Sequence, residues 1–442
     1  MPAAPADSLI YGCLFSDEDT ARLFTDSAEI RAMLLVEGAL ARVQGALGLI
    51  PADAAAFIDR ASQEVVIDPS ALAEQAARNG VPVPGLLGAF RKAAQAPEPM
   101  QYLHWGATSQ DIMDTALALR LRPMLGLWDG RLAALLSRLA DLADDYAALP
   151  MTARTYGQAA TPTGFGAIVA GWGWPLLDAQ TRLSSLPGAV LQVSLSGAAG
   201  TLSAMGAQGP AVRAALSEAL GLRDPGHSWH SDRTAPGQLA AWAAGLAGSL
   251  GKLGEDVMLL CQSGITEAGL AGTGGASSTM PQKQNPVGPS ALVALARHVI
   301  GLAALLQGAA IHRQQRDGAA WFGEWLALPQ LCICTGRMLS LAADIASSLT
   351  PDAAAMARGL AAGHGLLHAE ALTFALAEEM PRPTAQDIVK DLCRQAEASG
   401  TDLLTLATKR FPQVDWHLKL AERTLGHAPA EARAFALRVR GT

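Results

Sequence analysis

Charged residues are scarce in this sequence: Asp, Glu, Lys and Arg together make up 17% of its 442 positions. The formal net charge is −7, from 33 Lys and Arg against 40 Asp and Glu. Nucleic acid as the main partner would need a basic face, so this acidic balance argues against that class of protein. A small anionic substrate is still allowed, because a few local cations suffice to bind it. Half of the residues are hydrophobic, so a surface this poor in charge is expected to be partly covered by other subunits.

Cysteine is also rare and scattered, and it forms neither a CxxC pair nor a zinc-binding spacing. The five positions are Cys13, Cys261, Cys332, Cys334 and Cys393. An odd, dispersed set indicates free thiols in a reducing cytoplasm, which is where we expect the protein. The N-terminus has no basic segment before an apolar run, so no signal peptide is expected. Charged residues interrupt the apolar segments, so we expect no membrane span.

Runs of alternating β-branched residues are almost absent, and helical periodicity dominates instead. In residues 27–50 and 237–264, apolar side chains recur at three- and four-residue spacing. The one candidate strand is EVVI, residues 64–67, and Pro69 follows it. We therefore predict an all-α fold.

Two breaks, near QAPEP and SSLTPD, suggest three helical domains. We predict an N-terminal domain over residues 1–107, a central domain of long helices over 108–348, and a small C-terminal domain over 349–442.

The first of three polar segments is HWGATSQDIMDTALALRLR, residues 104–122. Thr108 and Asp111 fit a capping box ahead of an apolar-periodic run, which predicts that a helix begins here. The free N–H groups of that helix would point at Thr108, Ser109 and Gln110, and such an end can bind a carboxylate. Taken by itself, the pattern is better explained by plain capping, which needs nothing beyond Thr108 and Asp111.

The second segment is MTARTYGQAATPTGFG, residues 151–166. It places Arg154, Tyr156 and Gln158 between two long apolar segments, where the chain could have continued as core. This indicates either a surface that faces a ligand or an ordinary loop between helices.

The third segment is GGASSTMPQKQNP, residues 274–286, which interrupts long helical patterns with a polar loop. Its glycines allow a mobile lid. The lid would carry two adjacent serines, Ser277 and Ser278, and a single cation, Lys283, which could stabilise developing negative charge.

Together and in this order, the three segments resemble the fumarase/aspartase superfamily of helical lyases. The signature loop of that superfamily, usually GSSxMPxKxN, appears here as ASSTMPQKQN, with Ala276 where glycine is usual. The resemblance covers most of the chain and continues to QQRDGAAWFGEWLALPQL, residues 314–331.

This resemblance implies a homotetramer whose long helices form a shared bundle, with each active site built from three chains. It also implies chemistry through an aci-carboxylate dianion, with a group on the next carbon leaving or adding. The first serine of the loop, Ser277, corresponds to the catalytic base, and Thr108 and Ser109 correspond to carboxylate binders. Lys283 and Asn285 correspond to anion-binding and positioning residues. Further candidates for substrate binding are His104, Gln110, Arg154, Tyr156, Gln158, Ser278 and Arg316.

One departure from the superfamily narrows the reaction. Many members have RTHxQ in the second segment, where the His donates a proton to the leaving group, but this chain has RTYGQ with Tyr156. A Tyr with a pKa of about 10 is a poor acid for expelling an amine, whereas a carboxylate with a pKa of about 4 leaves without a proton. Tyr156 therefore favours a reaction that makes or opens a lactone.

The segments YLHWGATSQDIMDTAL and EWLALPQL are similar to the corresponding segments of bacterial carboxymuconate cycloisomerases, a branch of the same superfamily. That branch usually has Trp where Tyr156 stands, so the aromatic class is kept. The resemblance implies reversible lactonisation of a small tricarboxylate in aromatic-compound degradation, without a metal or cofactor and with Ser277 returning a proton to carbon.

Some residues and functions stay open at this stage. Arg316 matches an Arg near the substrate in the family, but it also fits a surface position, and His104 fits either substrate binding or orientation of the first segment. His364 and His368 are better explained as a pair on one helix face than as metal ligands, because no third ligand is evident. An enzyme like adenylosuccinate lyase or argininosuccinate lyase is an alternative, and a non-catalytic helical scaffold is a weaker one.

Overall fold

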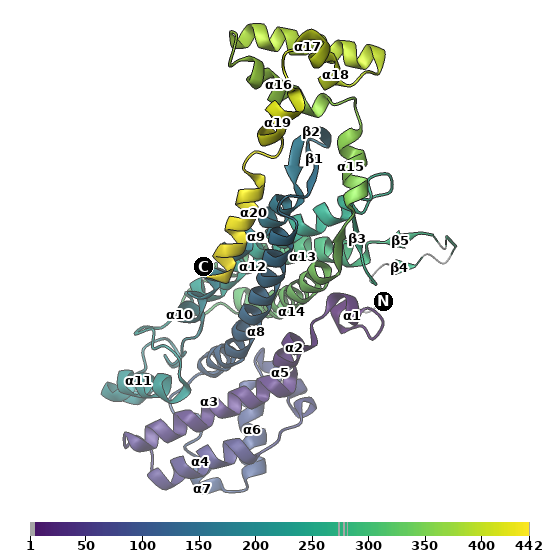
Figure 1. Ribbon diagram of the computed structural model, residues 1–442. Coiled ribbons are helices and arrows are strands. Elements are labelled where there is room, and N and C mark those ends of the chain that lie inside the picture. Colours follow the sequence, from purple (N-terminus) through teal and green to yellow (C-terminus); the bar gives the residue numbers. More distant parts are fainter. Residues whose placement is uncertain (1–4, 273–274, 277–278, 281, 442) are drawn as a thin grey trace. The chain divides into compact units, whose positions relative to one another are not determined.

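The computed structural model describes residues 5–272, 275–276, 279–280 and 282–441, and it is predominantly helical (Figure 1). The prediction of a mainly α-helical fold is confirmed. The chain separates into two compact units, each made of three segments. Unit 1 contains Met1–Arg131, Ala179–Gly248 and Ala294–Ser340, and unit 2 contains Leu132–Asp178, Ser249–Val293 and Leu341–Thr442. The division into three domains is a different partition of the chain and stays a prediction.

Four long helices contribute to both units, because the boundaries between the units fall within them. They are α8 (Ser109–Asp145), α12 (Thr234–Leu260), α13 (Val287–Ala309) and α14 (Gly318–Ser348). The periodic pattern of residues 237–264 corresponds to α12, so the helix expected there is confirmed. Two of the four, α13 and α14, are long and apolar enough to cross a membrane by length and composition alone. In their most apolar windows, 56% and 61% of the residues are buried inside the protein, as in the core helices of a bundle.

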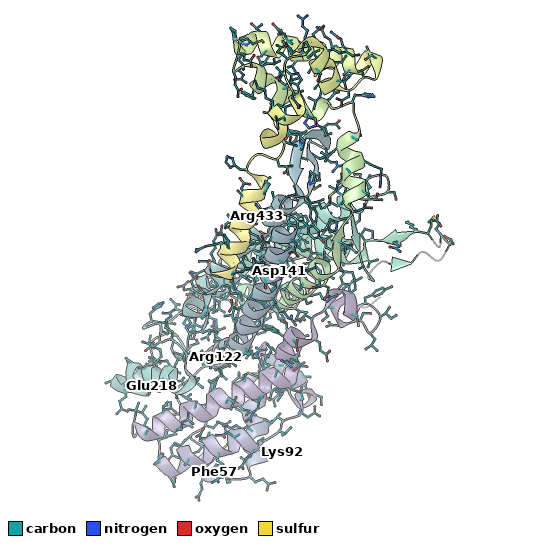
Figure 2. All side chains as sticks on the ribbon, in the orientation of Figure 1. Phe57, Lys92, Arg122, Asp141, Glu218 and Arg433 are labelled. Atoms are coloured by element: carbon teal, nitrogen blue, oxygen red, sulfur yellow. The ribbon has the colours of Figure 1, made fainter. Side chains whose placement is uncertain are left out.

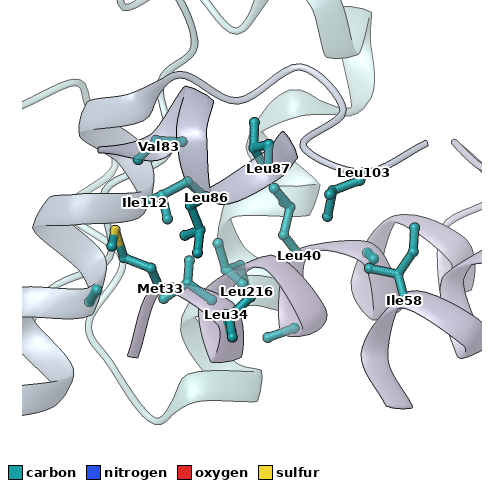
Figure 3. Close-up of a cluster of buried hydrophobic side chains, with 14 of the residues drawn as sticks. Met33, Leu34, Leu40, Ile58, Val83, Leu86, Leu87, Leu103, Ile112 and Leu216 are labelled. Atoms are coloured by element: carbon teal, nitrogen blue, oxygen red, sulfur yellow. The ribbon is translucent and has the colours of Figure 1, made fainter. Parts of the chain in front are cut away.

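Unit 1 also contains shorter helices near the N-terminus and around α11. They are α1 (Gly12–Phe15), α2 (Glu18–Ala21), α3 (Asp26–Ala46), α4 (Ala52–Glu64), α5 (Ala73–Asn79), α6 (Val83–Ala94), α7 (Pro97–Met100), α10 (Leu186–Val190) and α11 (Gly209–Leu220). The core of this unit draws on α3, α4, α6, α8 and α11, as Figure 3 shows. Met33, Leu86, Ile112 and Leu216 are each buried there.

Small residues on α3 allow α4 to approach closely. A Cβ atom at Gly38 would lie 2.0 Å from Ser62 Oγ, and one at Gly45 would lie 2.4 Å from Ala55 Cβ. Neither distance is compatible with a side chain, so at these two positions glycine is a packing requirement. The C-terminal end of α11 is held differently: the guanidinium of Arg122, labelled in Figure 2, donates to the carbonyls of Leu220 and Gly221.

The described part of unit 2 contains six short strands and the C-terminal helices. The strands are β1 (Pro150–Thr155), β2 (Gln158–Gly164), β3 (Ala268–Leu270), β4 (Gly275–Ala276), β5 (Gln284–Asn285) and β6 (Leu349–Pro351), and they pair as β1–β2, β3–β6 and β4–β5, all antiparallel. The helices are α9 (Phe165–Leu183, whose last residues belong to unit 1), α15 (Ala353–Ala361), α16 (Ala369–Leu376), α17 (Arg382–Ser399), α18 (Leu403–Arg410), α19 (Trp416–Thr424) and α20 (Ala428–Arg440). A small separate core, which includes Leu372, Leu392 and Trp416, joins α16 to α19.

The candidate strand at residues 64–67 is not formed. Helix α4 ends at Glu64, and the next residues are irregular. Val66 is fully exposed, and none of the described strands pairs with this segment. The longest strands lie instead in the second polar segment, which lacks the apolar alternation that indicates a strand.

Candidate active site

The first polar segment begins α8, and its Asp111 links three parts of unit 1. The Asp111 carboxylate accepts hydrogen bonds from the backbone N–H of Thr108 at 3.0 Å and from those of Ser196 and Gly197 at 2.8 and 2.9 Å. The bond from Thr108 is half of the predicted capping box. Asp111 is fully buried, so its charge is stabilised by these donors rather than by water.

The fourth partner of Asp111 is His230, which the sequence did not suggest. His230 Nε2 lies 2.7 Å from Asp111 Oδ1, and its other ring nitrogen, Nδ1, lies 3.4 Å from Nη2 of Arg316. Arg316 also donates from Nε to Gln110 Oε1 at 2.8 Å and from Nη2 to the carbonyl of Ala198 at 3.3 Å. Arg316 is therefore not a free surface residue, because the structure places it against the first polar segment.

Gln110 has a different environment from the one expected for a substrate ligand. It is fully buried, and its amide nitrogen donates to Asp114 Oδ2 and to the carbonyl of His230. Because its oxygen accepts from Arg316, the amide holds Arg316 and His230 within the chain. A role for Gln110 in binding substrate stays a prediction. By contrast, Thr108 and Ser109 are half-buried, and the part of the chain that the structure describes offers no hydrogen-bond partner to either hydroxyl.

A buried ionic cluster of Arg233, Asp114 and Glu324 contacts this region through Gln110, whose amide donates to Asp114. Arg233 donates to both carboxylate oxygens of Asp114 at 2.8 and 3.0 Å and to both of Glu324 at 2.6 and 2.7 Å. All three side chains are almost completely buried, and Trp229 stacks on the guanidinium, 4.8 Å from ring to cation. Burial raises the pKa of Glu324 despite the opposing effect of Arg233. Burial alone would lower the pKa of Arg233, but the two carboxylates outweigh it and raise that pKa.

His104 precedes the helix and is bound to a buried carboxylate. Its Nδ1 lies 2.6 Å from Glu37 Oε1 on α3, and its backbone φ of 65° lies in the left-handed region. Burial disfavours the charged imidazole, but the adjacent Glu37 favours it more strongly, so the pKa of His104 is raised above its ordinary value of 6.5. The carboxylate of Glu37 therefore favours the protonated form of this imidazole.

The second polar segment forms the β1–β2 hairpin of unit 2, with Tyr156 at its tip. Thr155 pairs with Gln158, and the two residues between them, Tyr156 and Gly157, have φ values of 53° and 73°. This is the backbone of a type I′ turn. Tyr156 is fully exposed in the single chain. A non-glycine residue in the left-handed region costs about 1–2 kcal/mol, so Tyr156 is held at the tip against its own preference.

Arg154 lies on β1 and is already paired within the chain. Its guanidinium binds both oxygens of Glu267 at 2.6 and 2.9 Å, and Glu267 is buried. Because this carboxylate neutralises the charge, the contact supports a role for Arg154 in fixing the hairpin. Direct binding of substrate by Arg154 stays a prediction.

The third polar segment is partly outside the described residues. Ser277 and Ser278, the predicted catalytic serine and its neighbour, both lie outside them. Around them, β4 pairs with β5, so Asn285 lies opposite Gly275. The side chain of Lys283 is exposed, and no ion pair joins it to another described residue.

The interpretation of His364 and His368 as a pair on one helix face is wrong. His364 lies in a turn with a φ of 54° between Gly363 and Gly365, whereas His368 ends the short 3-10 helix Leu366–His368. Within the described ranges, no group of three or more His, Cys, Asp or Glu side chains could hold a metal ion.

One cavity in unit 1 has a volume of about 400 Å³. Trp321 and Trp325 of α14 and Met33 of α3 contribute to its walls, and Asp114 and Glu324 reach it from the ionic cluster. None of the predicted site residues lines it. The cavity is therefore separate from the hydroxyls of the first segment.

Sequence reasoning missed the partners that hold the site together. They are Glu37, Asp114, His230, Arg233, Glu267 and Glu324. Most of these contacts join residues 60 to 120 positions apart, so a pattern of neighbouring residues in the sequence cannot predict them. One signal was available in the sequence: GHSWHSDR, residues 226–233, concentrates His, Trp and charge in a loop before an apolar helix.

Comparison with known proteins places this arrangement in a family. The family described as lyase matches residues 15–301, which is well over half of the chain. The chain belongs to this lyase family, the fumarase/aspartase superfamily.

Within the family, the chain is similar to enzymes that form lactones. It is 40% identical to the 3-carboxy-cis,cis-muconate cycloisomerase of Pseudomonas aeruginosa over 91% of this chain and 88% of the relative. The crystal structure of the 3-carboxy-cis,cis-muconate lactonizing enzyme from Pseudomonas putida superposes with a TM-score of 0.88 at 34% identity, covering 98% of both chains. The chain is also 34% identical to the nitrosuccinate lyase of Streptomyces davaonensis, over 97% of this chain and 94% of the relative.

Proposed function

We propose that this protein is a 3-carboxy-cis,cis-muconate cycloisomerase, which reversibly converts its substrate to 4-carboxymuconolactone. The observation that carries the proposal is the similarity over nearly the whole chain to cycloisomerases, combined with Tyr156 where many lyases have an acidic His. The substrate is a small tricarboxylate, and the reaction belongs to the degradation of protocatechuate through the β-ketoadipate pathway.

Substrate binding requires groups that neutralise several carboxylates without closing the site to a planar diene. The first segment offers the hydroxyls of Thr108 and Ser109 at the N-terminus of α8, where free N–H groups favour an anion. Arg316 lies against the same segment and adds positive charge, and His104, which precedes the segment's helix, is a further proposed ligand. Lys283, Asn285 and Ser278 of the signature loop and Gln158 of the hairpin complete the proposed set of ligands.

The reaction joins a carboxylate oxygen of the substrate to a carbon of its conjugated double bond. The electron pair of that bond moves toward the adjacent carboxylate and gives an aci-carboxylate, which then takes one proton at carbon. Ser277 is the proposed donor, and in the reverse direction it removes the same proton as base. Because the attacking or leaving group is a carboxylate with a pKa of about 4, no second acid is needed, and Tyr156 instead shapes the pocket.

We also propose that the protein is a cytoplasmic homotetramer that uses no metal or cofactor, with each site shared between chains. One exposed face of α13 supports the assembly. Gly301, Leu305 and Gly308 recur there at helical spacing, and Ile300 lies beside them. Leu305 is 62% exposed in the single chain, and a Cβ atom added at either glycine would meet nothing within 4 Å. An apolar stripe of this kind on a long helix is suited to packing against a partner helix.

A second candidate is a lyase reaction on nitrosuccinate, the compound in the name of the Streptomyces relative, for which we propose nitrite as the leaving group. Nitrite, like a carboxylate, is a weak base that leaves without a proton, so Tyr156 does not distinguish the two reactions. The direct test follows the ultraviolet absorbance of 3-carboxymuconate, nitrosuccinate and adenylosuccinate with the same enzyme. We expect turnover only with 3-carboxymuconate, unchanged after treatment with a chelator. Faster turnover of either other substrate would refute the proposal.

A further inference from the structure

We propose that His230 is a positioning residue of this site, and that it holds the guanidinium of Arg316 in the orientation that receives a substrate carboxylate. The inference deepens the proposed function and rests on it. It starts from the geometry of one buried ring that lies between a carboxylate and a guanidinium.

The contacts of His230 assign the roles of its two ring nitrogens. The guanidinium of Arg316 has no acceptor atom, so Nδ1 of His230 must accept the hydrogen bond between them. The carboxylate of Asp111 already accepts three backbone N–H groups, and Nε2 of His230 donates to it as a fourth partner. A proton on Nδ1 would face the guanidinium and break the contact.

The same contacts leave one part of Arg316 available. Its Nε–H donates to Gln110, and the two hydrogens of Nη2 go to His230 and to the carbonyl of Ala198. Nη1 has no partner among the described residues, and the side chain is only half-buried. A carboxylate of the substrate can therefore bind at Nη1. The three internal contacts meanwhile fix the plane and direction of the Arg316 guanidinium. Pre-orienting a cation in this way reduces the cost of ordering it when the substrate binds.

His230 suits this position because one side chain must offer a donor on one side and an acceptor on the other. Lys and Arg have no acceptor, and an ionised carboxylate has no donor. The two amide side chains each reproduce one half of the ring: Gln can place its N–H near the position of Nε2, and Asn can place its oxygen near the position of Nδ1. This pair of substitutions separates the contact with Asp111 from the contact with Arg316.

The test measures KM, kcat and the thermal midpoint for His230→Gln and His230→Asn with 3-carboxymuconate. His230→Gln keeps the bond to Asp111 and loses the one to Arg316, so KM should rise about tenfold with kcat within about threefold and the midpoint near wild type. His230→Asn should show the opposite: a KM within about threefold of wild type and a lower midpoint. A merely structural His230 would instead change stability in both variants without moving KM selectively.

A double-mutant cycle with Arg316→Met adds a second readout. If His230 acts through Arg316, His230→Gln should change KM less than about twofold once Arg316 is gone, whereas independent effects would multiply. His227→Gln, at an exposed position in the same loop, is the matched control and should match wild type. A normal KM for folded His230→Gln, or effects that multiply, would overturn the proposal. If His230→Gln does not fold, a tenfold rise in KM for His230→Asn would overturn it.

Failure of the inference can be told apart from failure of the proposed function. A wild-type enzyme that converts 3-carboxymuconate but shows multiplicative effects keeps the function and removes the role of His230. A wild-type enzyme that does not convert it removes the function. In that case, calorimetry measures the dissociation constant of propane-1,2,3-tricarboxylate for the wild type and for the variants of the double-mutant cycle. His230→Gln should again weaken binding only while Arg316 is present. Effects that multiply would contradict the role of His230.

Discussion

At the residue scale, the half-buried residues Thr108 and Ser109 of the first segment depend on buried groups for their position. Asp111 fixes the backbone at Thr108 and the loop at Ser196 and Gly197, so a residue that fits a helix cap also sets the position of the site. His104 is held in a similar way by Glu37. These buried carboxylates have no role in the proposed chemistry itself, but they orient the groups that do.

The pairing of His104 with Glu37 predicts a pH-dependent contribution to stability. The folded-state pKa of His104 is raised above 6.5, so the pair stabilises the fold fully below about pH 6.5. That contribution is lost as the pH rises through the folded-state pKa. Replacing Glu37 with Gln should therefore lower the thermal midpoint most below pH 6.5, and the gap from wild type should narrow at higher pH. Glu64→Gln, at an exposed position, should follow wild type throughout, and a gap for Glu37→Gln that is constant with pH would contradict the assignment.

The serines of the signature loop allow a sharp comparison between neighbours. If Ser277 transfers the proton, Ser277→Ala should lower kcat by about 10²–10⁴-fold with little change in KM, because the donor acts in the transition state. Ser278→Ala should be milder and should mainly affect KM. Steady-state kinetics with both variants decides the matter, and a reversed order would show that the roles within the pair are exchanged.

At the scale of elements, the sequence predicts the helices better than it predicts the hairpin and the tertiary contacts that hold the site residues in place. The apolar periodicity behind α3 and α12 is local, and so is the capping signal at Thr108. The β1–β2 hairpin has no such signal, because its strands are polar and its turn has Tyr-Gly rather than Asn-Gly. Likewise, the bond between His230 and Asp111 spans 119 positions and depends on tertiary packing alone.

At the hairpin tip, Tyr156 is expected to lower the stability of the fold while contributing to activity. Asn tolerates a positive φ better than Tyr, so Tyr156→Asn should keep or slightly raise the thermal midpoint while lowering kcat/KM. Tyr156→Phe keeps the ring, and loss of a hydrogen bond to a charged substrate should cost about ten- to a hundredfold in kcat/KM. Both are measured from pH 6 to 10. A fall beyond about a thousandfold for Tyr156→Phe, with the alkaline limb of the profile lost, would make Tyr156 an acid and remove the leaving-group argument.

At the scale of the whole molecule, the proposed burial between subunits would account for both the low charge content and the apolar face of α13. Leu305→Glu would place a charge in that interface, where an unpaired carboxylate is costly. We expect light scattering to show a tetramer for wild type and smaller species for this variant, with activity lost in parallel because each site needs several chains. Val66→Glu, at an exposed position outside the long helices, is the control and should stay tetrameric. A fully active wild-type monomer would contradict the shared site.

The central claim, that this lyase-family chain closes a lactone, is tested most directly by the product formed in deuterated water. Cycloisomerisation adds one solvent-derived proton at carbon and releases no fragment. Proton NMR of the reaction with 3-carboxy-cis,cis-muconate should therefore show 4-carboxymuconolactone with one carbon-bound deuterium per molecule. Unchanged 3-carboxymuconate, or a product without the lactone ring, would contradict the account.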